Sequence, residues 1–139
     1  MADPTGVLYA DTSALVKLAV EEAETHALRL ELTRWDAVAT SVITEIELAR
    51  AVARARERGA MTLDDVGVWT ITAALLELEL TAEIRRAAAV LRPTAVRSLD
   101  AIHVTTAASL GADLGGLLTY DLRMQHAVSD LGLSVVAPR

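Results

Sequence analysis

Four acidic residues stand at positions where folding could bring their side chains together. Asp11 and Asp121 each follow a short apolar run directly, and a helical pattern begins after each of them. Asp100 lies at the start of another predicted helix, and Glu47 lies one turn into a long one. Two carboxylates about 4 Å apart repel by about 4 kcal/mol at an effective dielectric of about 20, so protons or a cation must neutralise them. An oxygen-only cluster favours Mg²⁺ or Mn²⁺ over zinc, and a site of this kind handles phosphate groups.

Each acid also has a structural explanation when it is taken alone. Asp11 and Asp121 are good helix N-caps, which are worth about 1 kcal/mol, and Asp100 suits the positive end of a helix dipole. Glu47 could pair with Arg50 one turn further along its helix. Two of the acids nevertheless follow strands, and a third begins a helix that would face the same edge. This combination favours convergence of the four side chains.

Short apolar runs alternate with capped helical stretches along the chain. The predicted strands are residues 7–10, 37–40, 75–80, 116–120 and 134–137. The predicted helices are residues 13–20, 22–34, 43–58, 62–74, 82–91 (capped by Thr81), 99–110 (capped by Ser98) and 122–131. This order predicts a three-layer α/β/α fold around a short, mostly parallel sheet of four or five strands. Ligands of such folds bind outside the carboxyl ends of the strands.

Length and composition exclude several classes of protein. The 139 residues suit one domain, residues 1–139, and a hydrophobic content of 53% excludes disorder. The absence of cysteine excludes disulfide scaffolds and thiolate metal sites. Two tryptophans and two tyrosines are too few to stack bases, and the net charge of −6 excludes duplex-DNA binding through bulk charge. No signal peptide or membrane-spanning stretch is predicted, so we expect a cytoplasmic protein without membrane association.

Four segments carry the acids, in the order VLYADTSALVKL, TSVITEIELARA, RSLDAIHVTTA and LLTYDLRM. Together they resemble the PIN-domain ribonucleases and, more narrowly, the VapC toxins of bacterial toxin–antitoxin modules. Carried over by position, the acidic residues of that family are Asp11, Glu47, Asp100 and Asp121. The second segment also holds Glu45, which would point roughly 160° away from Glu47 on a helix and is the reserve candidate.

The resemblance implies a metal-dependent endoribonuclease that a cognate antitoxin neutralises. It implies Asp11, Asp100 and Asp121 around Mg²⁺ or Mn²⁺, with Glu47 binding the ion directly or through water. The ion would lower the pKa of a water that attacks phosphorus and would offset charge on the phosphate oxygens. It also implies a groove for an antitoxin segment and a homodimer interface in the apolar, helix-rich first half of the chain.

Three hydroxyl residues beside the acids have both a functional and a structural interpretation. Thr12 and Ser13 could bind Asp11 or a phosphate oxygen at a helix start, where amide dipoles favour anions. Thr119 could orient Asp121 without contacting the ion itself. Plain helix-start and strand roles are equally compatible with the sequence.

Basic residues form two groups near the acids. One repeats every four residues along the long predicted helix: Arg50, Arg54 and Arg58. The other lies upstream of the third acid: Arg85, Arg86, Arg92 and Arg97. Either group could contact RNA phosphates or an acidic partner, or could be a solvated face. His103 is expected to be packed and hydrogen-bonded rather than to bind zinc, because no second histidine has ligand spacing. Lys17 is expected at the surface.

Three alternative functions follow from the same acids. A phosphate enzyme of the haloacid-dehalogenase type needs a second acid two residues after Asp11, where this sequence has Ser13. A receiver domain needs paired early acids and a lysine on a late strand, and no lysine follows Lys17. A catalytically silent PIN-like binding module would act only through its protein partner. The presence of all four acids favours the enzyme, and a metal-dependent cleavage assay separates the two.

Overall fold

The computed structural model describes residues 3–139 and confirms the predicted alternation of strands and helices. The strands are β1 (Val7–Ala10), β2 (Ala37–Ser41), β3 (Leu76–Leu78), β4 (Leu114–Leu118) and β5 (Val135–Val136). The helices are α1 (Thr12–Ala19), α2 (Thr25–Leu32), α3 (Ile43–Glu57), α4 (Asp65–Ala73), α5 (Ala82–Ala89), α6 (Ser98–Ala108) and α7 (Leu122–Asp130). None of these helices is both long enough and apolar enough to cross a membrane.

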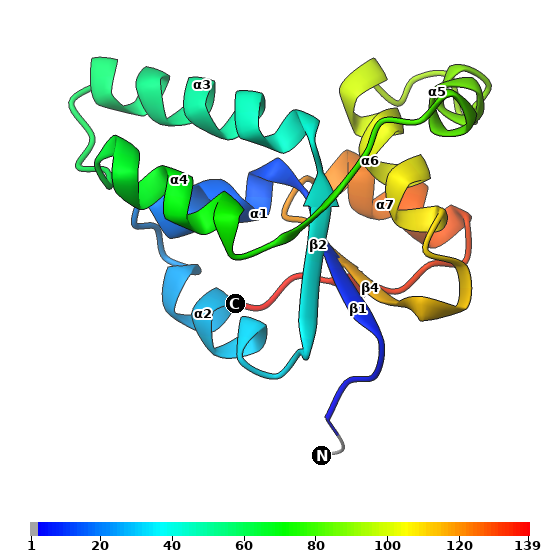
Figure 1. The fold of residues 1–139 in the computed structure, drawn as a ribbon, viewed down its shortest axis with the longest axis horizontal. Helices are drawn as coiled ribbons and strands as arrows, with labels where there is room; N and C mark the ends of the chain where they lie inside the picture. Colours follow the sequence, from blue (N-terminus) through cyan, green and yellow to red (C-terminus); the bar gives the residue numbers. More distant parts are fainter. Residues whose placement is uncertain (1–2) are drawn as a thin grey trace.

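The five strands form one parallel sheet in the order β3-β2-β1-β4-β5. Helices α1 to α4 lie on one side of this sheet and α5 to α7 on the other (Figure 1). The predicted three-layer α/β/α fold is therefore confirmed, and the sheet has the larger of the two predicted strand numbers.

Strand β1 is the centre of the molecule because both of its faces are covered. Its residues Leu8, Tyr9 and Ala10 are fully buried. Side chains alternate along a strand, so Leu8 and Ala10 join the core under α1 to α3, while Tyr9 joins the second core with Val104 of α6. This two-sided burial explains why the run VLYA contains no polar side chain able to face solvent.

The order of the strands reverses between β1 and β4. From β1 the chain moves outward through β2 and β3, and it then returns to the other side of β1 with β4 and β5. Such a reversal leaves a crevice outside the carboxyl ends of the two strands. Asp11 directly follows β1 and Asp121 comes three residues after β4, so both lie at this crevice.

Four helices, α1, α2, α4 and α6, begin at residues other than the predicted ones, which were 13, 22, 62 and 99. The side chain of Asp64 caps α4 by accepting a hydrogen bond from the Gly67 amide at 2.8 Å. Helix α6 begins at Ser98, with Arg97 at the N-cap position and no side-chain cap bond. Short polar residues cluster at both places, and sequence alone does not decide which of them adopts the extended backbone of a cap.

Lys17 was predicted at the surface, and this prediction is wrong. Its side chain is buried and forms ion pairs with Glu22 and Glu24, which follow α1 in the loop to α2. The ammonium also lies 4.8 Å from the centre of the Tyr120 ring. A buried lysine needs such partners because an unpaired charge is costly away from water.

Candidate active site

Asp11 is the most buried of the four acids, with 3% of its surface exposed. It caps α1: its Oδ1 accepts hydrogen bonds from the Ala14 amide at 3.1 Å and the Ser13 hydroxyl at 2.7 Å. Its Oδ2 accepts a hydrogen bond from the Thr119 hydroxyl at 2.6 Å. Both carboxylate oxygens are thus oriented by donors from two different elements.

The charge of Asp11 has no basic side chain paired with it in residues 3–139. Burial raises the pKa of Asp11, and the hydrogen bonds from Thr119 and Ser13 and the nearby His103 ring act in the opposite direction. Hydrogen bonds orient a buried carboxylate but do not cancel its charge. Asp11 is therefore a group that a cation would stabilise.

Glu47 reaches the same edge from the second turn of α3. Its Oε1 accepts hydrogen bonds from the Thr12 hydroxyl at 2.8 Å and from His103 Nε2 at 2.6 Å. Partial burial raises the pKa of Glu47, but the hydrogen bonds from His103 and the Thr12 hydroxyl act in the opposite direction, and the pKa of Glu47 is lowered. These contacts favour the ionised carboxylate.

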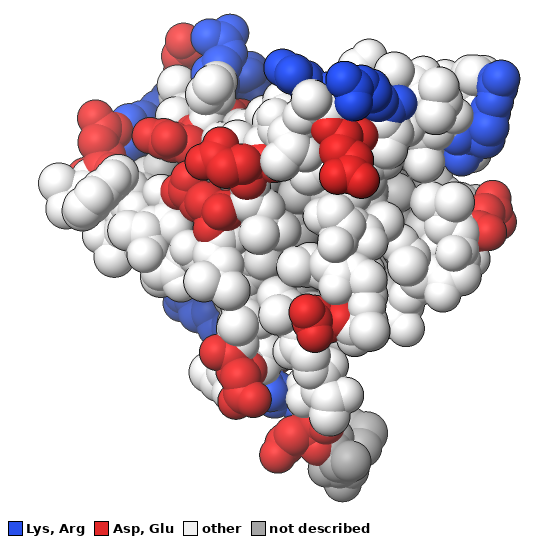
Figure 2. Space-filling view, turned by 45° about the vertical axis from the view of Figure 1, so that its right-hand side comes forward, with Lys and Arg blue, Asp and Glu red and all other residues white. Residues whose placement is uncertain are grey.

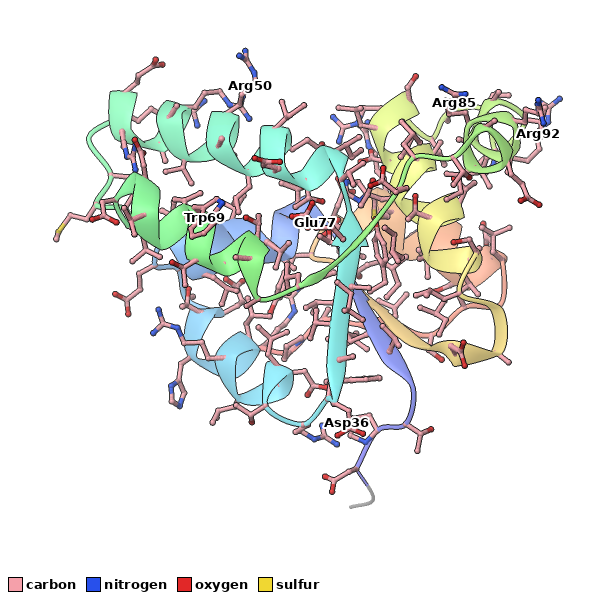
Figure 3. All side chains as sticks on the ribbon, viewed as in Figure 1. Asp36, Arg50, Trp69, Glu77, Arg85 and Arg92 are labelled. Atoms are coloured by element: carbon pink, nitrogen blue, oxygen red, sulfur yellow. The ribbon has the colours of Figure 1, made fainter. Side chains whose placement is uncertain are left out.

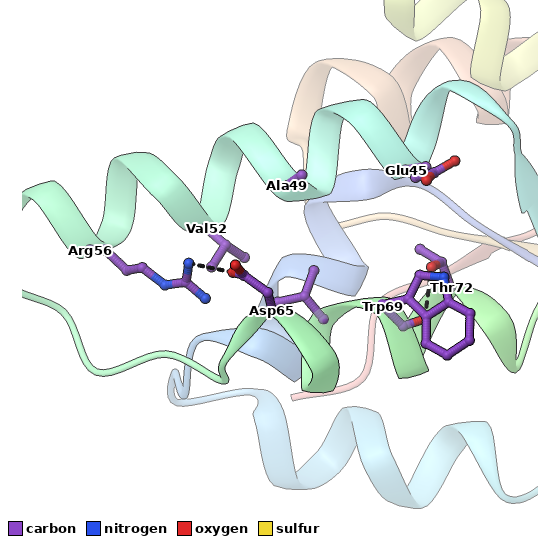
Figure 4. Close-up of a pocket in the computed structure, with 8 residues that line it drawn as sticks. Glu45, Ala49, Val52, Arg56, Asp65, Trp69 and Thr72 are labelled. Atoms are coloured by element: carbon purple, nitrogen blue, oxygen red, sulfur yellow. Dashed lines mark hydrogen bonds and ion pairs between the residues drawn. The ribbon is translucent and has the colours of Figure 1, made fainter.

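Glu45, the reserve candidate on the same helix, lies elsewhere. It is exposed and lines a groove between α3 and α4, at the opposite end from Arg56 and Asp65 (Figure 4). Because α3 turns its two glutamates in different directions, Glu47 is the one that joins the other acids.

Asp100 and Asp121 are held differently, by a basic side chain. The guanidinium of Arg97 donates to Asp100 Oδ2 at 3.2 Å and to Asp121 Oδ2 at 3.3 Å. The other oxygen of Asp121 accepts hydrogen bonds from the Arg123 and Met124 amides, so its predicted role as an N-cap is confirmed. About a quarter of each acid side chain is exposed, against 67% of Arg97.

Shared neighbours connect the four acids. Thr119 donates to Asp11 and accepts the backbone amide of Asp121 at 3.2 Å, and Thr12, beside Asp11, binds Glu47. His103, which also binds Glu47, lies one helical turn from Asp100. Acids at the other edge are remote, as Asp36 at the start of β2 illustrates (Figure 3). The structure thus links the acids in pairs at the carboxyl edge, and their convergence around one ion stays a prediction.

The arrangement is not a finished metal site. Within residues 3–139, no three histidine, aspartate or glutamate side chains lie close enough together to hold a metal ion. The donors are all carboxylates, which suit a hard divalent cation. Holding such an ion requires the side chains to move closer, and the exposed Arg97 bridge between Asp100 and Asp121 must give way.

The hydrogen-bond partners of the three hydroxyl residues differ in part from the prediction. Ser13 binds Asp11 as expected, whereas Thr12 binds Glu47 instead. Thr119 was expected to orient Asp121, but its hydroxyl proton goes to Asp11 and it touches Asp121 only through the backbone amide. Parallel pairing of β1 with β4 explains this, because it sets the end of β4 beside the end of β1.

Sequence reasoning missed three contacts at this edge. His103 is buried and hydrogen-bonded as predicted, but its bond to Glu47 was not foreseen, and neither was its partner Tyr9. The bridging role of Arg97 was also missed. Spacing held a signal for each: Tyr9 and Asp11 share a strand face, and His103 and Arg97 each lie three residues from Asp100.

The predicted basic stripe on α3 is exposed along its length, at Arg50, Arg54 and Arg58. Arg50 extends away from the body of the molecule, and Arg85 and Arg92 lie near α5 (Figure 3). Basic side chains line the upper edge of one face, above groups of acidic ones (Figure 2). This edge supplies local positive charge on a chain whose net charge is negative.

A groove lies between α3 and α4. The resemblance implies an antitoxin groove in the helix-rich first half of the chain, and its assignment to this groove stays a prediction. Its walls include Ala49, Val52 and Val68, and Trp69 stands over it with 65% of its surface exposed (Figure 4). An ion pair of 2.7 Å between Arg56 and Asp65 closes one end. An exposed tryptophan beside a groove is typical of a protein-binding surface.

A comparison with protein families decides the identity of this fold. The model of the PIN domain matches residues 8–129. The chain belongs to the PIN-domain family. Among curated relatives, this PIN domain is 43% identical to Ribonuclease VapC35 of Mycobacterium tuberculosis, over 95% of this chain and 97% of that protein. It is 39% identical to Ribonuclease VapC46 of the same organism, over 94% of this chain and 97% of that protein.

Solved structures share the same fold. VapBC2 from Rickettsia felis, bound to a DNA fragment from its promoter, matches with a TM-score of 0.69 and 14% identity, covering 96% of this PIN domain and 99% of that chain. VapC20 of Mycobacterium tuberculosis, a toxin that cleaves the sarcin-ricin loop, matches with a TM-score of 0.66 and 18% identity, covering 86% and 94%. The predicted resemblance to PIN domains and VapC proteins is confirmed.

Proposed function

We propose that this PIN domain is a VapC-type toxin: a divalent-metal-dependent endoribonuclease that hydrolyses RNA phosphodiester bonds and that a cognate antitoxin neutralises. The observation that carries the proposal is the buried carboxylate of Asp11, which has no basic partner within residues 3–139 and lies, like Asp121, at the strand-order reversal. The relatives named ribonucleases, 39–43% identical over nearly the whole chain, support RNA as the substrate.

The four acids have distinct roles in this proposal. Asp11, Asp100 and Asp121 hold Mg²⁺ or Mn²⁺, and Glu47 binds the ion directly or through water. When bound, the cation offsets charge on the phosphate oxygens and lowers the pKa of the attacking water. Asp11 is already oriented by its hydroxyl donors, and Asp100 and Asp121 would hold the ion in place of the Arg97 guanidinium.

Two surfaces are candidates for binding the substrate and the protein partner. The exposed arginines of α3 contact RNA phosphates, or an acidic segment of the antitoxin, beside the acids. An apolar antitoxin segment occupies the groove between α3 and α4 against Trp69. An antitoxin that rescues growth of cells expressing the wild-type chain should therefore rescue cells expressing Trp69→Ala less well. We also propose a homodimer, which light scattering of the purified protein tests.

The central experiment is RNA cleavage by the purified chain with MnCl₂ or with excess EDTA. We expect cleavage that depends on added metal and is lost in Asp100→Asn. Asp113→Asn is the matched control, because Asp113 is exposed and precedes β4 at the other end of the sheet. Equal cleavage in EDTA would refute the metal dependence. Antitoxin binding without any cleavage by the wild type would instead indicate a silent binding module.

A further inference from the structure

A line of hydrogen bonds runs from the core of the molecule to the acidic edge. The hydroxyl of Tyr9 lies 2.7 Å from His103 Nδ1, and His103 Nε2 lies 2.6 Å from Glu47 Oε1. Tyr9 is fully buried and His103 is 1% exposed, whereas Glu47 is only partly buried. The two rings meet edge to face, with centroids 5.9 Å apart. A buried pair is thus in direct contact with a proposed metal ligand.

The elements that carry this line are those that carry the acids. Tyr9 precedes Asp11 by two residues on the central strand, and His103 follows Asp100 by three residues on α6. A histidine that only fills the core needs partners for its two nitrogens and nothing more. Here one partner lies in the core and the other is an acid of the candidate active site.

The hydrogen bonds along this line are all donated in the same direction, from Tyr9 toward Glu47. The hydroxyl of a tyrosine is protonated at neutral pH, so Tyr9 has one proton to donate. The hydroxyl then donates to Nδ1, which leaves the ring proton on Nε2 to be donated to Glu47. A carboxylate can only accept, so this polarity satisfies every group in the line.

Glu47 receives these donors on a single oxygen. Both His103 and Thr12 donate to Oε1, and no hydrogen bond from the described residues reaches Oε2. Two donors on one oxygen determine the plane and direction of a carboxylate more firmly than either does alone. The other oxygen is left without a hydrogen bond from residues 3–139.

We propose that Tyr9 and His103 are positioning residues: Tyr9 holds His103 in its Nε2–H tautomer, and His103 orients Glu47 for the metal ion. This inference rests on the proposed function, because it assigns Glu47 to the metal site. Partners of metal ligands typically change metal affinity by about 10- to 100-fold when they are removed. The buried pair would therefore contribute to ion binding without touching the ion.

Two substitutions at one position separate orientation from packing. The amide nitrogen of Gln in His103→Gln reaches the position of Nε2 and can still donate to Glu47. The shorter side chain of His103→Asn reaches the position of Nδ1, where it keeps the contact with Tyr9 but not that with Glu47. Both variants lose the ring, so their packing defects are matched.

Calorimetric titration of the purified chain with MnCl₂, without RNA, measures the effect. We expect Mn²⁺ affinity to fall about 10- to 100-fold in His103→Asn and to stay within about threefold of wild type in His103→Gln. RNA cleavage at saturating Mn²⁺ should recover in both. Equal affinities in the two variants would overturn the positioning role.

Tyr9→Phe keeps the aromatic ring and removes only the hydroxyl, so it tests the line if both His103 variants unfold. In metal-free protein, ¹⁵N chemical shifts of His103 should show the Nε2–H tautomer in wild type and a mixture in Tyr9→Phe. The same tautomer in both would overturn the role of Tyr9. A wild type that shows the tautomer yet neither binds Mn²⁺ nor cleaves RNA would refute the proposed function while leaving the hydrogen-bonded line in place.

Discussion

The acidic edge has two halves that are held by opposite means. The inner acids, Asp11 and Glu47, accept hydrogen bonds from hydroxyls, an amide and a histidine that come from the protein core. The outer acids, Asp100 and Asp121, share one exposed guanidinium. The inner half is therefore oriented but not neutralised by a basic side chain, whereas the outer half is partly neutralised, by one guanidinium shared between two carboxylates, and is weakly held.

This difference indicates how an ion would enter. Exposed ion pairs contribute about 0–1 kcal/mol each, so the outer half can exchange its arginine for a cation at little cost. The inner half keeps its geometry because its donors are built into α1, β4 and α6. Preorganised ligands on one side and exchangeable ligands on the other allow binding without refolding.

The substitution expected to have the largest effect on the inner half, and on RNA cleavage, is Asp11→Asn. We expect RNA cleavage to fall by at least about 10³-fold, since this removes the buried anion at the centre of the proposed site. Asn still accepts hydrogen bonds as a helix cap, so the fold should persist. Asp36→Asn, at the opposite edge, is the control, and both are measured with a labelled RNA. If Asp11→Asn cleaved RNA as fast as the wild type, Asp11 would not be part of the active site.

The outer half is tested by Arg97→Gln. Loss of two exposed ion pairs should tighten Mn²⁺ binding by about five- to tenfold, or about 1 kcal/mol, because the ion no longer competes with a guanidinium. Calorimetric titration measures the change. Arg123→Gln removes the same charge from the neighbouring helix α7 and should have a smaller effect. Weaker binding in Arg97→Gln would mean that the arginine holds the outer acids ready instead.

The inner half of the acidic edge should also make the stability of the protein depend on pH. Because burial raises the pKa of Asp11, the folded state prefers its protonated form, and metal-free stability is lost as pH rises through that pKa. Asp11→Asn has no group that titrates at this position. The free energy of unfolding of Asp11→Asn minus that of the wild type should therefore increase as the pH rises from about 4, where unfolded aspartate titrates, toward neutrality. Urea unfolding in EDTA at several pH values measures it, and a constant difference would contradict it.

The smallest expected effect is on RNA binding, and it concerns the exposed arginines of α3. Arg54→Gln should weaken RNA binding by about two- to threefold at moderate salt and reduce the salt slope by about 0.7. Arg29→Gln on α2 is the matched control, since it removes one exposed arginine from a different helix. Fluorescence anisotropy with single-stranded RNA at several salt concentrations distinguishes them. Identical slopes would show that the α3 stripe is a solvated face.

The inner and outer acids could be predicted from sequence because their signals are local. An apolar run followed by Asp marked both Asp11 and Asp121, and a parallel sheet sends the carboxyl ends of its strands to one edge. The choice of Glu47 over Glu45 came from the family resemblance, and helix periodicity showed only that the two side chains point in different directions. The PIN-domain resemblance then added what local patterns do not contain, namely the substrate and the ion.

The contacts of these acids could not be predicted because they depend on packing between distant elements. The donation from Thr119 to Asp11 requires the register of β1 against β4, and the bond from His103 to Glu47 requires the position of α6 beside α3. The bridge made by Arg97 depends on a side-chain rotamer. Lys17 was misplaced for the same reason, because its glutamate partners come from the following loop.

The pairing of β1 with β4 has a consequence for synthesis of the protein. Leu8 lies beside Gly116, so the first strand to leave the ribosome waits for a neighbour made 108 residues later (116 − 8). Until then Asp11 lacks Thr119, and Asp121 has not been translated. Contacts this distant form late in folding. Unfinished polypeptides therefore lack the complete set of acids that the proposed RNA cleavage requires.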